Sequence, residues 1–337
     1  MSDNDTPEPI DPNANTLSSP AILLLGEPGA GKTFSLATTI RPNTDDRLVY
    51  LYTDPGGDES LMDALDHYKV PLRQVYFRHV PPASQGWSGL LSMADQINKF
   101  NYESLSSMKN GVDKQSHRQI YELISVLGDF KCQRTNRSLG DASTWGNDTI
   151  FALDSLSGVN TMAKDGTVGA KPTLHKGEWG TAMALEEAFI RKVVSGIKCR
   201  RILIGHLDKV MDEVAGRMMF SVALLGNKLA PKIPLLFSDV ILAKRSDEGK
   251  HLWATTDPRI SLKYRNLPSS DSLEPSFAAI WNKWEARKKR VRESLIDEAK
   301  EQTKGLDMNE ISVMPTTAAP TSSAPSTASP LTGASKP

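Results

Sequence analysis

Short apolar runs of strand length alternate along the chain with longer segments whose apolar residues recur at helical spacing. The runs that predict strands are 21–25, 48–53, 149–153, 201–205 and 240–245, with further β segments at 251–255 and 260–264. Helical spacing predicts helices over 32–39, 87–100, 116–128, 180–197 and 276–303. Near-continuous apolar strands that alternate with helices are typical of a parallel sheet covered on both faces, so the pattern predicts an α/β fold.

The two ends of the chain differ in composition from its middle. Residues 1–17 are acidic and proline-rich, and 313–337 are almost entirely Pro, Thr, Ser and Ala. Such segments bury too little apolar surface to offset the entropy of ordering. We expect disordered tails over 1–17 and 306–337 around one domain at 18–305. Within it, 81–147 is interpreted as a helical insertion to which the sequence assigns no chemistry.

Charge and cysteine content narrow the class of protein. Lys+Arg and Asp+Glu both number 40, so any nucleic-acid contact has to come from a local patch. Cys132 and Cys199 fit neither a zinc spacing nor a disulfide framework, which favours a reducing compartment. The N-terminus lacks the pattern of a signal peptide, and the apolar run 21–25 is too short to span a bilayer. The sequence therefore predicts a soluble cytoplasmic protein without a membrane partner.

A glycine-rich motif lies between the first predicted strand and the first predicted helix. It satisfies the Gly-x-x-x-x-Gly-Lys-Ser/Thr pattern of a phosphate-binding loop, together with the strand–loop–helix context that this pattern requires. Glycines allow the backbone to wrap around phosphate, and the helix N-terminus directs N–H groups toward the anion. This predicts a nucleoside triphosphate site, with ATP as the expected ligand. Its predicted nucleotide-binding residues are Gly26, Glu27, Pro28, Gly29, Ala30, Gly31, Lys32, Thr33 and Phe34.

Carboxylates follow two other strands. Lys32 is expected to reach the β- and γ-phosphates, and the Thr33 hydroxyl to ligate Mg²⁺. Asp154 ends the apolar strand 149–153 and is the second predicted Mg²⁺ ligand. Asp54 ends the strand 48–53 and is the candidate that orients or activates the attacking water, with Glu59 as the reserve. An ordinary role in the turn formed by the residues after Asp54 is the alternative.

Taken in order, these motifs resemble RecA and its phage-encoded relatives over about 20–284. The segment 151–156, with Ser following Asp154, is similar to the Walker B strand of that family. Asp54 falls where the family carries its catalytic glutamate, and the residue here is one methylene shorter. His206, after the strand 201–205, falls at the polar γ-phosphate sensor, which is usually Gln in the recombinases and His in smaller phage ATPases. The resemblance implies a RecA-like P-loop NTPase core.

The resemblance also implies partners. Lys263 and Arg265 fall where basic residues of RecA-like filaments reach the nucleotide of a neighbouring subunit, which predicts a homo-oligomeric ring or filament. Their alternative role is ordinary surface charge. Segments 158–179 and 207–230 fall at the two DNA-binding loops of the family. Residues suited to a single strand within them are Lys164, Lys171, His175, Lys176, Trp179, Lys209, Gly226, Asn227 and Lys228.

These implications lead to a specific expectation and two alternatives. The chain is most similar to phage ATP-binding proteins of the RecA-like single-strand annealing type, which predicts a DNA-handling ATPase of phage recombination or replication in the host cytoplasm. A P-loop switch or loader that engages a protein partner is the first alternative, and the balanced charge favours it. A small-molecule phosphotransferase with Lys131, Arg134 and Arg137 in a lid is the second.

Overall fold

The computed structural model describes residues 17–84, 86–107, 117–169, 175–212, 216–226 and 228–310. The chain divides into two compact units. Asn15–Lys289 is one unit, and it contains all the strands described below. Of the other unit, the structure describes the part of a helix that follows Lys289. The predicted tails lie outside the described residues, with two exceptions. Leu17 is described, and residues 306–310 belong to the helix that follows Lys289.

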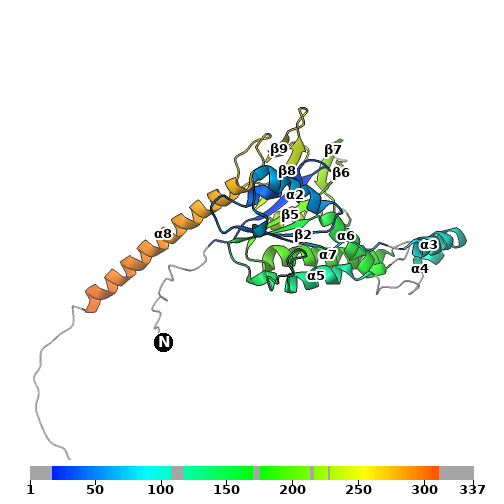
Figure 1. Cartoon of the computed structure of the whole chain (residues 1–337), viewed down its shortest axis with the longest axis horizontal. Helices are drawn as coiled ribbons and strands as arrows, with labels where there is room; N and C mark the ends of the chain where they lie inside the picture. The colour runs from blue at the N-terminus through cyan, green and yellow to red at the C-terminus, as the bar shows by residue number, and fades with distance from the viewer. Residues whose placement is uncertain are drawn as a thin grey trace, which may run out of the picture. The chain divides into compact units, whose positions relative to one another are not determined.

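A mainly parallel sheet of seven strands forms the centre of the first unit (Figure 1). Its order is β3-β2-β4-β5-β1-β8-β9, and only β9 runs antiparallel to its neighbour. The strands are β1 (Ala21–Gly26), β2 (Arg47–Tyr52), β3 (Val75–His79), β4 (Thr149–Asp154), β5 (Arg200–Gly205), β8 (Asp239–Arg245) and β9 (His251–Ala254). The α/β class predicted from the apolar pattern is confirmed.

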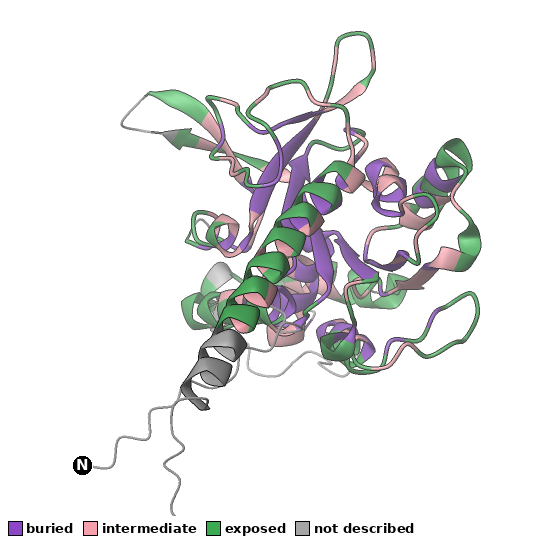
Figure 2. Cartoon of the chain, turned by 90° about the vertical axis from the view of Figure 1, so that its left-hand side faces the viewer, coloured by how far each residue is buried: buried purple, intermediate pink, exposed green. Residues whose placement is uncertain are grey.

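Alternate residues of each inner strand pack against helices on opposite faces of the sheet. In β1, Leu23 and Leu25 belong to one core cluster, whereas Ile22 and Leu24 belong to the other. Because side chains alternate along a strand, apolar residues at every position indicate burial on both faces. Figure 2 shows the resulting buried centre of the sheet.

Helices cover both faces. The first cluster includes residues of α5 (Gln119–Gly128), α6 (Leu156–Val168) and α7 (Lys176–Gly196). The second includes residues of α2 (Gly57–Tyr68), of the start of α8 (Phe277–Glu310) and of the helix after the glycine-rich loop. That last helix is short, because α1 (Lys32–Ser35) continues as the 3-10 helix η1 (Leu36–Thr39). Further 3-10 turns are η2 (Leu72–Gln74), η4 (Ala142–Thr144) and η5 (Ile233–Leu236).

The secondary structure differs from the sequence expectations at β3, at segment 260–264 and at the end of α8. The edge strand β3 was not predicted, because Val75–His79 is short and only Val75 is fully buried. Segment 260–264 forms no strand and makes only isolated pairings, such as Lys263 with Val240. Helix α8 continues to Glu310, past its predicted end at residue 303.

The segment predicted as an insertion is not uniform. Helices α3 (Trp87–Lys99) and α4 (Tyr102–Ser107) come first, and α3 buries none of its side chains. The second half belongs to the main core, because Ile120, Phe130 and Trp145 are buried in the first cluster. Both cysteines are free and buried. Among the described residues, no helix combines the length and apolarity needed to span a bilayer.

Glu186 is a fully buried carboxylate in α7. One of its oxygens accepts the Leu225 N–H at 3.0 Å, and the other has no hydrogen-bond partner. Burial raises the pKa of Glu186 from 4.5 to about 7, and the bond from Leu225 opposes that rise only in part. The folded state therefore retains the proton to higher pH than the unfolded chain does.

We expect Glu186→Gln to stabilise the protein above neutral pH. At pH values below the pKa of Glu186 in the unfolded chain, the carboxyl is protonated in both states and costs the folded state no stability. As pH rises through about 7, the buried carboxyl becomes charged and the folded state loses stability. The variant should gain up to about 3 kcal/mol at about pH 8 and much less at about pH 5. Urea unfolding across this range measures the gain, and the exposed Glu248→Gln serves as control. A pH-independent difference between Glu186→Gln and wild type would contradict the assignment.

Candidate nucleotide-binding site

The glycine-rich loop joins the end of β1 to the start of α1, as predicted. Gly31 precedes α1 with φ +80°, and a Cβ there would lie 2.5 Å from the ring of His251. At Gly26 a Cβ would lie 2.6 Å from the Ala243 carbonyl oxygen. The loop is therefore enclosed by β8 and β9, and these two positions accept only glycine. Its close backbone and the N-terminus of the following helix provide N–H groups for an anion.

The Lys32 side chain is bound inside the loop that precedes it. Its Nζ donates to the carbonyl oxygens of Gly26 at 2.9 Å and Glu27 at 2.8 Å. Burial lowers the pKa of Lys32, while the carboxylates of Asp154 and Asp54 act in the opposite direction. The ammonium group is thus desolvated and held among acceptors, where a phosphate would be a stronger, charged partner.

Asp154 and Thr33 meet at the carboxyl end of β4. The Thr33 hydroxyl donates to Asp154 Oδ2 at 2.6 Å, and the Tyr50 hydroxyl donates to the same oxygen at 3.0 Å. Burial raises the pKa of Asp154, although both of these hydrogen bonds favour the charged form. Hydroxyl and carboxylate oxygens are ligands that Mg²⁺ accepts, so the two predicted metal ligands lie together with suitable chemistry.

Asp54 lies beside them at the end of β2. The Ser155 hydroxyl donates to Asp54 Oδ2 at 2.6 Å, and the Thr53 hydroxyl donates to Oδ1 at 3.2 Å. These bonds orient the carboxylate. Asp54 also contributes to the electrostatic environment of both Lys32 and Asp154. The structure therefore groups Asp54 with the loop and the metal-ligand pair.

His206 follows β5 and faces the same site. Its Nδ1 is 2.8 Å from the Ser157 hydroxyl. Burial and, to a lesser degree, the Lys32 charge lower the pKa of His206 below 6.5, while Asp54 opposes the shift. The imidazole is therefore neutral near pH 7 and carries one donor and one acceptor nitrogen.

Strand order explains why these residues meet. Leu25 of β1 pairs with Gly205 of β5, and Asp154 of β4 pairs with Ile204 of β5 and Tyr52 of β2. The carboxyl ends of four adjacent parallel strands therefore share one edge, where ligands of open α/β sheets bind. Residues far apart in sequence become neighbours through this register.

An aromatic cluster adjoins the loop. Phe34, at the start of α1, has ring centroids 5.4 Å from His67, 5.8 Å from Tyr68 and 5.8 Å from His251. Tyr68 is 41% exposed, so the cluster has a face open to a ligand. Phe34 was predicted as a nucleotide contact, whereas its three neighbours were not.

Lys263 and Arg265 are not near the loop within the chain. Lys263 pairs with Val240 at the start of β8, the end of the strand opposite to the loop. Its ammonium donates to the Phe237 carbonyl at 2.5 Å, and the Arg265 N–H donates to Asp239 Oδ1 at 2.7 Å. Any contact with nucleotide would have to involve a second subunit, and that role stays a prediction.

The two segments predicted as DNA-binding loops contain regular structure. Segment 158–179 is mostly α6 and the first turn of α7, with Lys164 paired to Asp165 and His175 capping α7. Segment 207–230 begins with an antiparallel hairpin formed by β6 (Leu207–Asp212) and β7 (Arg217–Val222). Lys209 lies in β6, Gly226 and Lys228 follow β7, and Lys171 and Asn227 lie outside the described residues.

The remaining candidates come from α2 and from the loop that follows α5. Glu59 belongs to the first turn of α2 and lines a surface hollow with Asp63 and Arg134. Arg134 donates to the carbonyls of Leu72 and Val75, and Arg137 donates to the Tyr76 hydroxyl. Both arginines thus fasten their loop to the β3 edge, which is not the arrangement of a lid over the loop.

Comparisons with known proteins find similarity among solved structures. No family model and no curated protein matches the chain. Among solved structures, the chain is similar to a prototypical ATPase from the type III secretion system of pathogenic bacteria. The TM-score is 0.30 at 11% identity, over 68% of this chain and 52% of that one. The chain thus spans about half of that protein's length.

The sequence did not predict the residues whose hydroxyl groups hydrogen-bond to the candidate site side chains. Tyr50 binds Asp154, Ser155 binds Asp54 and Ser157 binds His206. Two tyrosines in the buried strand β2 were a usable signal, because a buried hydroxyl needs a partner. The serines carry no comparable signal, since their partners come from other strands.

Proposed function

We propose that the chain binds ATP with Mg²⁺ and hydrolyses the γ-phosphate. The observation that carries the proposal is the meeting of Lys32, Thr33, Asp154 and Asp54 at the carboxyl edge of β1, β2 and β4. A glycine turn alone explains neither the buried ammonium nor the two carboxylates beside it. Their combination is what phosphoryl transfer needs.

Each residue has a role that follows from its contacts. The loop N–H groups and the Lys32 ammonium bind the phosphates, and the ammonium exchanges two carbonyl partners for charged oxygens. Thr33 and Asp154 would hold Mg²⁺, which when bound neutralises charge on the phosphate oxygens. Asp54, oriented by Ser155, accepts a hydrogen bond from the attacking water and aligns it.

The aromatic cluster fits the nucleobase. Phe34 directly follows Thr33, the last residue of the phosphate-binding loop, so a base bound near Phe34 lies within reach of phosphates in the loop. Offset stacking on Phe34, Tyr68 and His251 would hold the base through its π-face. This contact contributes affinity without requiring a particular hydrogen-bond pattern.

Single-stranded DNA of phage recombination or replication is the first partner that we propose, as the resemblance to RecA implies. The support in the structure is the N-terminal turn of α7, where Lys176 is exposed and Trp179 is 39% exposed. A cation with an exposed aromatic ring suits a phosphate backbone and a stacked base. Nucleotide state would reach this turn through Ser157, which binds His206 and belongs to the preceding helix α6.

A protein partner is the second candidate, and the β6–β7 hairpin favours it. The hairpin follows His206 directly, and its paired residues Met211 and Met218 are 55% and 46% exposed. Exposed methionines on such a surface suit an apolar protein contact.

One experiment separates the two partners. We expect single-stranded oligonucleotides to stimulate ATP hydrolysis and to bind more tightly than duplex, with an affinity that falls steeply with salt. Trp179→Ala should reduce binding about 10-fold or more, the effect of losing one stacked base. Met211→Ser, which removes an exposed apolar side chain from the hairpin, is the matched control. If hydrolysis ignores DNA and binding shows no salt dependence, the protein partner becomes the better proposal while the ATPase assignment stands.

A further inference from the structure

Helix α3 carries an apolar stripe whose large side chains the other described residues leave exposed. Trp87, Leu90, Leu91, Ala94 and Ile97 recur at the spacing that places residues on one side of a helix. The four large side chains among them are 84%, 46%, 71% and 52% exposed in that order. The charged residues of the helix, Asp95 and Lys99, form an ion pair beside this stripe. An exposed apolar surface of this kind marks an interaction site.

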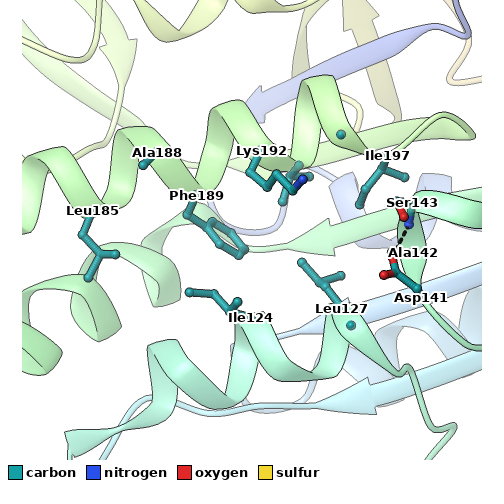
Figure 3. Close-up of a pocket in the computed structure, with 13 residues that line it drawn as sticks. Ile124, Leu127, Asp141, Ala142, Ser143, Leu185, Ala188, Phe189, Lys192 and Ile197 are labelled. Carbon is teal, nitrogen blue, oxygen red and sulfur yellow. Dashed lines mark hydrogen bonds between the residues drawn. The ribbon is translucent and has the colours of Figure 1, made fainter.

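The same chain has an open apolar groove between α5 and α7 (Figure 3). Ile124 and Leu127 line it from α5, and Leu185, Ala188 and Phe189 line it from α7. Figure 3 shows these side chains directed into the space between the two helices. The groove encloses about 400 Å³, and its charged lining residues are confined to Asp141 and Lys192.

We propose that α3 of one copy of this chain docks in the α5–α7 groove of a second copy. Both surfaces are apolar, and within the part of the chain that the structure describes both are left open. At about 1.5 Å per residue, α3 is about 20 Å long and α5 about 15 Å long, so the stripe matches the length of the groove wall. A helix laid between two others buries its apolar face as in a helical bundle.

The contact has a definite symmetry. A helix on one copy fits a different surface on the next, so the interface is heterologous and leads to a ring or an open filament. Each copy inside such an assembly inserts its α3 into the groove of one neighbour and binds the α3 of another neighbour in its own groove. Association by these surfaces does not depend on ATP hydrolysis, so the inference stands apart from the proposed function.

Two charge substitutions test the contact from its two sides. Leu91→Glu alters the stripe, and Ile124→Glu, whose side chain is 46% exposed, alters the groove. We expect wild type to form oligomers in sedimentation velocity, and each variant alone to require at least about 30-fold higher concentration. Leu235→Glu, which changes a 73% exposed leucine of η5, should associate as wild type does.

Mixing the two variants identifies the direction of docking. Each variant retains one intact surface, so an equimolar mixture should give dimers that cannot grow further. A wild-type chain that stays monomeric at about 100 µM would overturn the proposal. Monomers in the mixture, with both variants as heat-stable as wild type, would overturn it equally.

Cross-linking supplies a second test that needs no disruptive change. The native Cys132 and Cys199 are buried, so engineered thiols react selectively. Leu91→Cys mixed with Ala188→Cys should give disulfide-linked heterodimers under mild oxidation. A double variant that links only within single chains would show that α3 occupies its own groove, and would overturn docking between copies.

Discussion

Lys32→Ala is expected to abolish ATP hydrolysis, with a loss in kcat of at least about 100-fold to 1,000-fold. The side chain is buried among the loop carbonyls of Gly26 and Glu27, where phosphate oxygens would be its charged partners. Alanine removes the charge that the transition state needs and leaves two acceptors without their donor. Phosphate release at saturating ATP measures the loss.

The control for this variant is a lysine outside the site. Lys250→Ala removes a side chain that is 75% exposed, and hydrolysis should be unchanged. ATP bound but never hydrolysed by wild type would assign the nucleotide a structural role. That result would also show that Asp54 is not a working catalytic group.

Asp154→Asn should separate activity from stability. The variant loses the carboxylate of the predicted Mg²⁺ site, so hydrolysis should fall at least about 100-fold. Asparagine still offers an oxygen to the hydroxyls of Thr33 and Tyr50. Because burial raises the pKa of Asp154, the charged form destabilises the folded state as pH rises through that pKa. The apo variant should therefore melt at or above the wild-type temperature near neutral pH.

Calorimetry without nucleotide and phosphate release with Mg²⁺–ATP give the two readings. Asp148→Asn is the matched control, since it changes a half-exposed carboxylate just before the same strand. It should leave both hydrolysis and melting temperature close to wild type. An inactive Asp154→Asn that also melts well below wild type would indicate a structural carboxylate instead.

Local patterns determined the class of fold and the glycine-rich loop. Apolar residues at every position of 21–25 require burial on both faces, and the strand–loop–helix context identifies Gly26–Thr33 without any tertiary information. The elements that were missed or wrongly predicted have weaker sequence patterns. Val75–His79 is half-buried at a sheet edge, and segment 260–264 has an apolar pattern that isolated pairings satisfy.

The sequence by itself determined an α/β chain with a phosphate-binding loop and a carboxylate after each of two further strands, because these features are local. Only the tertiary structure decided which residues share the site. The order β2-β4-β5-β1 brings Asp54, Asp154 and His206 to the loop, and the same register places Lys263 at the opposite end of β8. The tertiary structure also shows regular elements where two loops were predicted. Gly158 of α6 packs closely against Thr53. The strands β6 and β7 form backbone hydrogen bonds with each other. Strand order and register are long-range properties, and no pattern within a single segment encodes them.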